Sequence, residues 1–378
     1  MKKVLLVAGF IVLVGMAQIA SAVPWKFAVT ADSRKYDTTG VNSPVVTSIA
    51  NAIVAENVDF MIFTGDPIAG PMANGGTMTA QLTVWKTAMA PVYNANIPVY
   101  VVRGNHEIQN PDPLFVDNVY PLGALTINSP ALTAEFQAFF PEMPQNGPVG
   151  EKGLTYSIDH NNARFVAIDN YAGRSATFND TQYNDTTNSG MINQWALDQI
   201  TNATADTPWV FAFGHEPLFV GHNPSCLANA YDERDALLDA LGPKTGIYLT
   251  AHDHSYARQT APDSYGHLVN QLMVASAGAG WYDLDQIGVN ASIDHGIIPT
   301  TVFFNGKTTA TNTNQISQKN GYLLVTIDGN TLLGEWKGED GSTGNWQTYD
   351  SFTMIVPEPA TLGLMLLGAL ALLRRRSA

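Results

Sequence analysis

The stretch VYVVRGNHE, residues 99–107, determines the expected fold because it places three polar residues directly after an apolar run and a glycine. Its first residues are β-branched or aromatic, which favours a buried strand, and glycine is typical of the turn that follows one. Asn105, His106 and Glu107 are therefore expected just beyond the end of a strand. In open α/β sheets, ligands bind at such strand ends.

The same unit, a short apolar strand followed by a small residue and a polar one, occurs four more times. The four segments are WKFAVTAD (residues 25–32), FMIFTGD (60–66), WVFAFGH (209–215) and IYLTAHDH (247–254). Helices are expected between them over residues 44–58, with Ser43 as N-cap and Pro44 in the first position, and over residues 192–200. This alternation favours parallel strands, whose carboxyl ends lie on one side of a sheet, so the five polar ends should converge.

The last third of the chain shows a different pattern. Residues 268–276, 321–328, 331–336 and 351–355 are predicted to be strands without helices between them. They indicate a second, more antiparallel sheet packed on the first. Residues 300–320, rich in Thr, Asn and Gly, are predicted to form a surface loop.

The polar residues at the five strand ends offer nitrogen and oxygen ligands and no sulfur. They are Asp32, Asp66, Asn105, His106, His215, His252 and His254. This set suits Zn, Mn or Fe, and two ions rather than one, because a carboxylate can bridge ions about 3.5–4 Å apart, the spacing that clamps the oxygens of an in-line phosphoryl displacement. Taken singly, each aspartate could instead cap a helix, and the asparagine could belong to a turn.

With these motifs the sequence resembles the calcineurin-like metallophosphoesterases, from about Trp25 to Trp336. The matching motifs are DSR (32–34), GD (65–66), GNHE (104–107), GH (214–215) and AHDH (251–254). The segment HDHSYAR (252–258) is similar to the GHxHxYxR of the purple acid phosphatases. The resemblance implies an α/β fold, a four-layer αββα sandwich in which two mixed β-sheets are flanked by helices.

The resemblance also implies a role for each matching residue. Asp66 would bridge two divalent or trivalent ions of Fe, Mn or Zn. The other ligands would be Asp32 and His254 on the first ion, and Asn105, His215 and His252 on the second. His106 would stabilise or protonate the leaving oxygen, and a metal-bound hydroxide would attack the phosphorus. Glu107 would orient a histidine or a loop from outside the ligand set.

Two positions depart from the family pattern. Arg34 stands where most members have a histidine ligand, and Ala69 stands where purple acid phosphatases have a tyrosine. A guanidinium offers no lone pair, so the first ion is expected to be weakly bound or absent, and no purple colour is expected. If the strand continues past Asp32, Arg34 points into the pocket and binds substrate phosphate. In the alternative, Arg34 turns outward and pairs with an acidic surface residue.

Several other residues are expected outside the ligand set. Three histidines are predicted to lie on the surface or in loops: His160, His267 and His295. His222 either lines the pocket or belongs to an exposed loop. Trp281 and Tyr282 form either a substrate wall or part of the core. Cys226 is the single cysteine, which excludes an internal disulfide, and it is expected to be an inert thiol.

Both ends of the chain have the features of targeting segments. Residues 1–22 combine two lysines, an apolar run and the small residues ASA, which predicts a signal peptide cleaved after Ala22 rather than a retained anchor. Residues 356–378 combine VPEP, a short apolar run and three arginines, and they resemble the PEP-CTERM sorting tail. The resemblance implies a tail that holds the protein in a bacterial inner membrane until an exosortase removes it, the alternative being an uncleaved anchor. Residues 23–355 would be the phosphoesterase domain.

The composition excludes some classes of protein. Hydrophobic residues make up 45% of the 378 residues, enough to bury a core, so wholesale disorder is excluded. The net charge is −14, and it becomes −18 without both ends because five basic residues and one acidic residue are removed. Such an acidic chain is not expected to wrap nucleic acid.

The functional hypothesis is a secreted, metal-dependent phosphoesterase that hydrolyses a small phosphomonoester or phosphodiester at the cell surface or outside the cell. The alternative is a catalytically weak or inactive surface or matrix protein that keeps the fold for binding, for which Arg34 and Ala69 are the best evidence. Asn105 and His106 favour the enzyme, because a binding protein has no physical need to keep them.

Overall fold

The computed structural model describes residues 23–70, 76–108, 129–172, 190–204, 206–219, 226–281, 300–304, 308–316, 319–340 and 344–356. The predicted signal peptide, the sorting tail beyond Val356, His222, Tyr282 and His295 lie outside these residues. Within them, no helix has the length and apolar character needed to cross a membrane.

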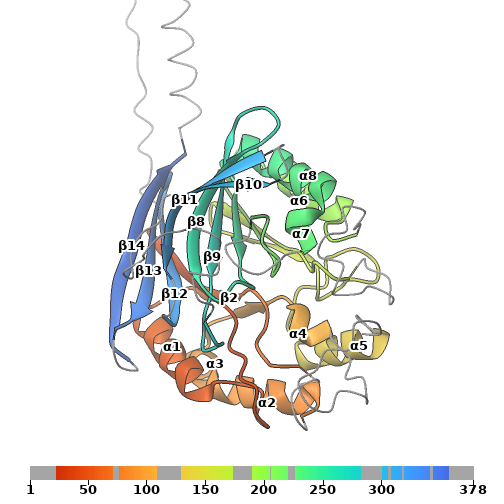
Figure 1. Cartoon of the computed structure of the whole chain (residues 1–378), viewed down its shortest axis with the longest axis vertical. Helices are drawn as coiled ribbons and strands as arrows, with labels where there is room; N and C mark the ends of the chain where they lie inside the picture. The colour runs from red at the N-terminus through yellow and green to blue at the C-terminus, as the bar shows by residue number, and fades with distance from the viewer. Residues whose placement is uncertain are drawn as a thin grey trace, which may run out of the picture.

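Six strands form the first sheet, in the order β14-β13-β12-β1-β2-β3 (Figure 1). Their bounds are β1 Trp25–Thr30, β2 Phe60–Phe63, β3 Val99–Val101, β12 Gly321–Asp328, β13 Thr331–Glu339 and β14 Trp346–Ile355. β1, β2 and β3 run parallel, whereas β12 joins β1 in the antiparallel direction. The sheet is therefore mixed, as the resemblance implied.

Eight strands form the second sheet, in the order β10-β11-β8-β9-β7-β6-β5-β4. Their bounds are β4 Tyr156–His160, β5 Ala163–Ala167, β6 Trp209–Phe213, β7 Ile247–Thr250, β8 Tyr256–Pro262, β9 Leu268–Val274, β10 Thr300–Phe304 and β11 Thr308–Ile316. β5, β6, β7 and β9 are parallel neighbours, and the outer strands pair with them or with one another in the antiparallel direction. This sheet is mixed too.

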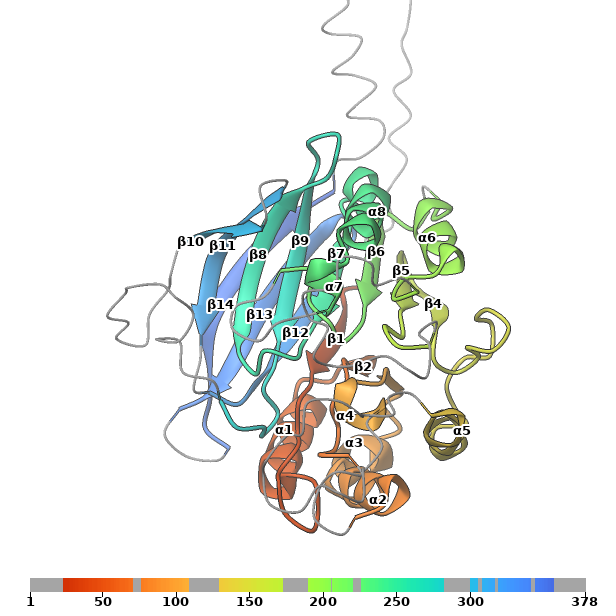
Figure 2. The same cartoon turned by 45° about the vertical axis from the view of Figure 1, so that its right-hand side comes forward.

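Helices cover the outer faces of the two sheets. Their bounds are α1 Ser43–Ala55, α2 Met78–Ala88, α3 Ala90–Asn94, α4 Asn105–Ile108, α5 Pro130–Phe139, α6 Gln194–Thr201, α7 Cys226–Asn229 and α8 Tyr231–Leu241, with a 3-10 turn at Gly242–Lys244. Helices α1 to α3 lie together beside the first sheet and α6 to α8 beside the second (Figure 2). For example, Trp85 of α2 meets Phe63 of β2 with ring centroids 5.0 Å apart. The predicted αββα sandwich is confirmed.

The two sheets pack on each other through aromatic rings. Phe27 of β1 stacks on Phe60 of β2 at 5.3 Å, and Phe165 of β5 stacks on Phe211 of β6 at 4.8 Å. The two pairs meet edge to face, because Phe27 lies 5.1 Å from Phe165 and 5.2 Å from Phe211. All four rings are buried. Aromatic rings bury large apolar areas and favour this geometry, so they hold the parallel strands of one sheet against those of the other.

The prediction that the later strands form a second sheet is wrong. β12, β13 and β14 extend the first sheet beyond β1, while β9 joins β7 in the second. The five predicted parallel strands are instead divided between the sheets, β1 to β3 in one and β6 and β7 in the other. Alternation of strands and helices could not show this division, because each strand–helix–strand unit has the same pattern in either sheet.

Two local predictions are also wrong. The predicted surface loop at residues 300–320 contains two strands, because residues 300–304 form β10 and residues 308–316 form β11, which pairs with β8. Threonine is β-branched and favours strands, which the loop prediction underweighted. At the start of α1 the N-cap is Asn42 rather than Ser43. The side-chain amide of Asn42 donates to the carbonyl of Gly278 at 2.8 Å instead of capping the helix.

Candidate metal centre

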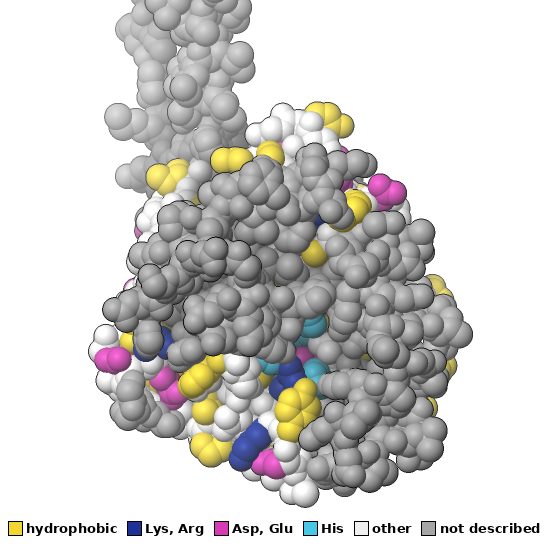
Figure 3. All heavy atoms as spheres, in the orientation of Figure 1, with side chains coloured by type: hydrophobic (Ala, Val, Ile, Leu, Met, Phe, Trp, Pro, Cys, Tyr) yellow, Lys and Arg dark blue, Asp and Glu magenta, His cyan; other side chains and the backbone are white. Residues whose placement is uncertain are grey.

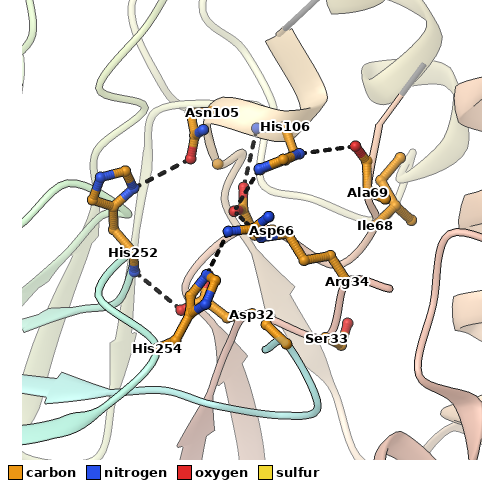
Figure 4. Close-up of polar contacts among 12 residues, drawn as sticks. Asp32, Ser33, Arg34, Asp66, Ile68, Ala69, Asn105, His106, His252 and His254 are labelled. Atoms are coloured by element: carbon orange, nitrogen blue, oxygen red, sulfur yellow. Dashed lines mark hydrogen bonds and ion pairs between the residues drawn. The ribbon is translucent and has the colours of Figure 1, made fainter. Parts of the chain in front are cut away.

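The predicted site residues come together where strands of both sheets end (Figure 4). From the first sheet come the residues that follow β1, β2 and β3, and from the second those that follow β6 and β7. They are Asp32, Arg34, Asp66, Asn105, His106, Glu107, His215, His252 and His254, and all are buried. In the space-filling view, histidine, acidic and basic side chains meet at one place on the surface of this face (Figure 3).

Strained backbone turns several of these side chains into the site. Asp32, Asp66, His252 and His254 have φ values of 56°, 52°, 75° and 49°. They are four of the eight non-glycine residues with positive φ in the described part of the chain. Side chains with a Cβ rarely adopt this region, and such strain costs on the order of 1–3 kcal/mol and gathers at functional sites. The backbone of these loops is therefore held in an unfavourable conformation, and in that conformation the four side chains point into the site.

Two glycines let the loops approach one another. A Cβ on Gly104 would lie 2.0 Å from Asp66 Oδ1, and a Cβ on Gly65 would lie 2.5 Å from His215 Nδ1. Neither contact is possible for a residue with a side chain, so the glycines of the GD and GNHE motifs are required by packing at the site.

Four potential ligand atoms form the first of two groups. Asn105 Oδ1 lies 3.1 Å from His215 Nε2 and 3.2 Å from His252 Nδ1. His215 Nε2 lies 3.3 Å from His252 Nδ1 and 3.5 Å from Asp66 Oδ1. An ion bound tetrahedrally at roughly 2.0–2.1 Å sets its ligand atoms about 3.4 Å apart. The four separations lie close to that spacing. We call Asp66, Asn105, His215 and His252 the four-ligand group.

The protonation of His215 shows why this group fits a cation. Its Nδ1 lies 2.9 Å from the carbonyl oxygen of Thr64, so Nδ1 carries the proton and donates it, and Nε2 keeps its lone pair. Burial, and to a lesser extent His252, lowers the pKa of His215 to about 3, which leaves the ring neutral at neutral pH. The lone pair therefore faces the oxygens of Asn105 and Asp66. Electron-rich atoms facing one another in this way are stabilised by a cation between them.

Asp32, Asp66 and His254 form the other group, with one potential ligand atom each and all of these atoms within 4.8 Å of one another. The backbone N–H of His252 donates to Asp32 Oδ2 at 3.0 Å, whereas Asp32 Oδ1 is buried and has no hydrogen-bond partner among the described residues. Burial and the charge of Asp66 raise the pKa of Asp32 well above its usual value. A buried oxygen without a donor fits a cation ligand.

Arg34 places its guanidinium in this same group. Nη2 lies 2.8 Å from His254 Nε2, and Nε lies 3.6 Å from Asp66 Oδ2. β1 ends at Thr30, so the strand does not continue past Asp32, and Arg34 instead forms an isolated bridge with Val41. The side chain nevertheless points into the site and is only 8% exposed. It does not turn outward.

His106 borders both groups without belonging to either. Its Nδ1 lies 2.8 Å from the carbonyl of Ala69, so Nε2 has the lone pair and lies 3.9 Å from Asp66 Oδ2. Burial and the charge of Arg34 lower the pKa of His106 to about 4. The ring is therefore neutral at neutral pH and has a lone pair at Nε2 that can accept a hydrogen bond.

Glu107 holds the surrounding loops together. Its carboxylate accepts hydrogen bonds from the backbone N–H groups of Gly104 at 2.7 Å, Asp66 at 3.2 Å and Ile68 at 3.4 Å. Burial and the charge of Asp66 raise its pKa, and these three donors oppose that rise. Glu107 thus connects the turn after β2 to the turn after β3.

The sequence matches the calcineurin-like phosphoesterase family over residues 26–256, more than half of the chain. The chain belongs to this family. Membership in the calcineurin-like phosphoesterases implies a metal-dependent hydrolase, which agrees with the buried cluster of aspartates and histidines. Residues 356–377 match the PEP-CTERM protein-sorting motif. The resemblance to purple acid phosphatases stays a prediction.

A solved phosphatase structure has the same fold. The calcineurin-like chain is similar to a dimetal phosphatase from Danio rerio, with 15% identity and a TM-score of 0.53 over 88% of this chain and 99% of that one. It also matches GAP50, the anchor in the inner membrane complex of Plasmodium, with 14% identity and a TM-score of 0.44 over 88% of this chain and 89% of that one. Vps29 from Chaetomium thermophilum matches with 10% identity and a TM-score of 0.34 over 88% and 98% of the two chains. The comparison with curated proteins found no match.

One residue of the calcineurin-like site was missed in the sequence. Asn170, which follows β5, accepts hydrogen bonds at Oδ1 from the backbone N–H groups of His215 at 2.9 Å and Glu216 at 3.0 Å. It thereby positions the loop that carries His215. The segment RFVAIDN, residues 164–170, has the same pattern of an apolar run followed by polar residues and could have indicated it.

The remaining predicted residues lie away from the ligand groups. His160 packs against Trp25 and is partly exposed, and His267 is half exposed and bonded to Asp263. Trp281 is 47% exposed, so it is not part of the core. Cys226 is the first residue of α7.

Proposed function

We propose that this protein is a secreted phosphoesterase that uses bound metal to hydrolyse a small phosphomonoester or phosphodiester. The observation that supports this most is the four-ligand group, in which Asp66 Oδ1, Asn105 Oδ1, His215 Nε2 and His252 Nδ1 each lie 3.1–3.5 Å from another member. This group would hold an ion of Zn, Mn or Fe. Asp32 and His254, with Asp66, offer ligands to another ion, which Arg34 opposes by its charge. A bound ion supplies Lewis acidity and lowers the pKa of a water nucleophile.

His106 is proposed to transfer a proton to the leaving oxygen. Without substrate, the ring of His106 is neutral at neutral pH, because burial and the charge of Arg34 lower its pKa. A phosphate anion next to Nε2 would stabilise the protonated ring, since an opposite charge favours the charged form. His106 would then carry a proton only when substrate is present, and it would donate that proton from Nε2 as the ester bond breaks.

Arg34 is proposed to bind the substrate phosphate. Its guanidinium is buried beside Asp66 and His254, and a planar fork of N–H donors matches two phosphate oxygens. Glu107 is proposed to keep Asp66 and the turn after β3 in register through its three backbone hydrogen bonds.

Phosphate release by the purified protein tests this function. With Mn²⁺ or Zn²⁺, the protein is expected to hydrolyse members of a panel of phosphomonoesters and phosphodiesters and to stop in excess chelator. His215→Ala should abolish hydrolysis by removing a member of the four-ligand group. The matched control is His267→Ala, at a half-exposed histidine bonded to Asp263, which should keep full activity.

Two outcomes would contradict the proposal. Full activity in excess chelator would exclude a metal-dependent reaction. A folded, metal-loaded protein that hydrolyses no member of the panel would favour the alternative of a surface or matrix protein that keeps the fold for binding.

Export and sorting are proposed from the two ends of the chain. The PEP-CTERM motif implies processing by an exosortase in a bacterium, and residues 1–22 have the features of a signal peptide. Protein recovered from the surface or medium of the native host is expected to begin near Val23 and to lack the three terminal arginines by mass spectrometry. Arginines 374–376 on exported protein would show that the tail is a permanent anchor.

A further inference from the structure

The guanidinium of Arg34, which is always positively charged, lies beside the residues that would bind the first ion. They are Asp32, Asp66 and His254. Figure 4 shows the guanidinium of Arg34 between the carboxylate of Asp66 and the ring of His254. Tyr36 also contacts the guanidinium, with its ring centroid 5.1 Å from the guanidinium carbon and its hydroxyl in contact with Nη1. The isolated bridge of Arg34 with Val41 holds the backbone in place as well. Contacts with Asp66, His254 and Tyr36 therefore hold the guanidinium in place.

Arg34 uses the lone pair that a metal would need. His254 Nδ1 contacts the carbonyl oxygen of Gly280 and so carries the proton, which leaves the only lone pair of the ring on Nε2. That lone pair accepts from Nη2 of Arg34 at 2.8 Å. A neutral imidazole cannot serve the guanidinium and a metal ion with the same nitrogen, so the two compete for His254.

Arg34 also provides the charge that the site requires. Arginine stays protonated in proteins, and its side chain here is buried. Its charge acts on the carboxylate of Asp66, because Nε lies 3.6 Å from Asp66 Oδ2. A metal ion in this position would be repelled by the guanidinium and would have no uncommitted histidine.

We propose that the guanidinium of Arg34 replaces the first metal ion, so that the centre holds one ion, bound by Asp66, Asn105, His215 and His252. The inference rests on the proposed function for the metal at that four-ligand group. A phosphate group would then lie between the ion and the guanidinium, which offers N–H donors where a second ion would offer an empty coordination position. The chain thus carries a one-metal version of a two-metal site.

Counting bound metal tests the inference without relying on activity. The purified protein is equilibrated with Mn²⁺, and the bound ions are counted per chain and examined by electron paramagnetic resonance. We expect one ion per chain, with the spectrum of an isolated ion. Arg34→His removes the cation, frees Nε2 of His254 and adds an imidazole, so it should bind two ions and give the spectrum of a coupled pair. Arg34→Lys keeps the charge and should stay at one ion.

Two further variants locate the ion and control for the substitution. Arg164→His changes an arginine that pairs with Asp159 at the surface, and it should leave one ion per chain. His215→Ala should remove the ion from the otherwise unchanged protein. Combined with Arg34→His, it should leave one ion, held at the first position.

Each result decides a different question. Two tightly bound ions in the unchanged protein would overturn the inference and leave the proposed function intact. A single ion that survives His215→Ala but is lost in Asp32→Asn would also overturn it, because the ion would then lie where we place the guanidinium. No bound ion would contradict the proposed function itself. The number of ions bound by the unchanged protein tests the inference even if the Arg34→His variant does not fold.

Discussion

Backbone carbonyls, rather than carboxylates, orient three histidine rings at the site. His106, His215 and His254 each present Nδ1 to a carbonyl oxygen, from Ala69, Thr64 and Gly280 respectively. Each contact fixes the proton on Nδ1 and turns the lone pair of Nε2 towards the site. Burial lowers the pKa of all three rings. They are therefore neutral, and able to act as ligands or acceptors, at neutral pH.

His106→Ala should separate catalysis from metal binding. The residue lies outside both ligand groups, so the metal content should stay unchanged. Loss of its proton transfer should lower turnover by about 10²–10⁴-fold. The measurements are steady-state kinetics and metal analysis of the same preparation, and unchanged turnover would remove His106 from the mechanism.

Gly104→Ala should damage the site through packing alone. The added Cβ would lie 2.0 Å from Asp66 Oδ1 and 2.5 Å from its backbone nitrogen, so the turn after β2 must move. We expect loss of bound metal and a decrease of about 1–3 kcal/mol in the free energy of unfolding.

The control for this substitution is Gly280→Ala, because a Cβ there meets nothing within 4 Å. It should retain the metal and the stability of the unchanged protein. Urea unfolding and metal analysis measure both effects. Normal metal content in Gly104→Ala would show that the turn adapts.

At the scale of elements, two ion pairs join the sheets outside the aromatic core. Arg258 of β8 contacts Asp350 of β14 at 2.9 Å, and Tyr256 donates to the same carboxylate at 2.7 Å. Near the site, Arg103 after β3 contacts Asp169 after β5 at 2.6 Å, and both side chains are fully buried. Each pair connects a strand of the first sheet with a strand of the second.

Asp350→Ala should weaken the contact between the sheets. It removes the partner of Arg258 and of the Tyr256 hydroxyl, and a largely buried charge without a partner is costly, so we expect a loss of about 2–3 kcal/mol in unfolding free energy. Asp159→Ala is the matched control, because its pair with Arg164 is exposed and should contribute only about 0–1 kcal/mol. Urea unfolding of both variants measures the difference. Equal losses would mean that the pair between the sheets has no special role.

At the scale of the whole molecule, the candidate metal centre is shared by both sheets. Asp66 and Asn105 come from the first sheet, and His215 and His252 come from the second. A metal ion in the four-ligand group would therefore cross-link the two halves of the sandwich, and it should stabilise the folded state more than the unfolded chain.

Metal addition is therefore expected to raise the thermal midpoint. At a free Mn²⁺ concentration one hundred times the dissociation constant, one ion adds about 2.7 kcal/mol to the unfolding free energy. Chelator should reverse the increase, and His215→Ala should show none. Scanning calorimetry with and without Mn²⁺ provides the measurement. The same increase in His215→Ala would place the stabilising ion elsewhere.

The strands and the polar residues that follow them could be predicted from the order of residues. Each unit is a run of β-branched and aromatic residues ended by a small residue, and this pattern depends only on neighbours in the chain. The segment 209–213 was predicted to be a strand and is one. The polar residues were also predicted correctly to follow β1, β2, β3, β6 and β7. The family motifs added the αββα arrangement.

The arrangement of these units depended on contacts between distant residues, which no local pattern contains. β1 pairs with β12, so that Phe27 lies opposite Val325, and this pairing moved the late strands into the first sheet. Asn170 became part of the site only because β5 lies beside β6. Arg34 meets His254 across 220 residues of chain, at a turn where the backbone had already left the strand. Packing of the two sheets brings these groups together, and for that reason the position of the guanidinium could be found only in the folded molecule.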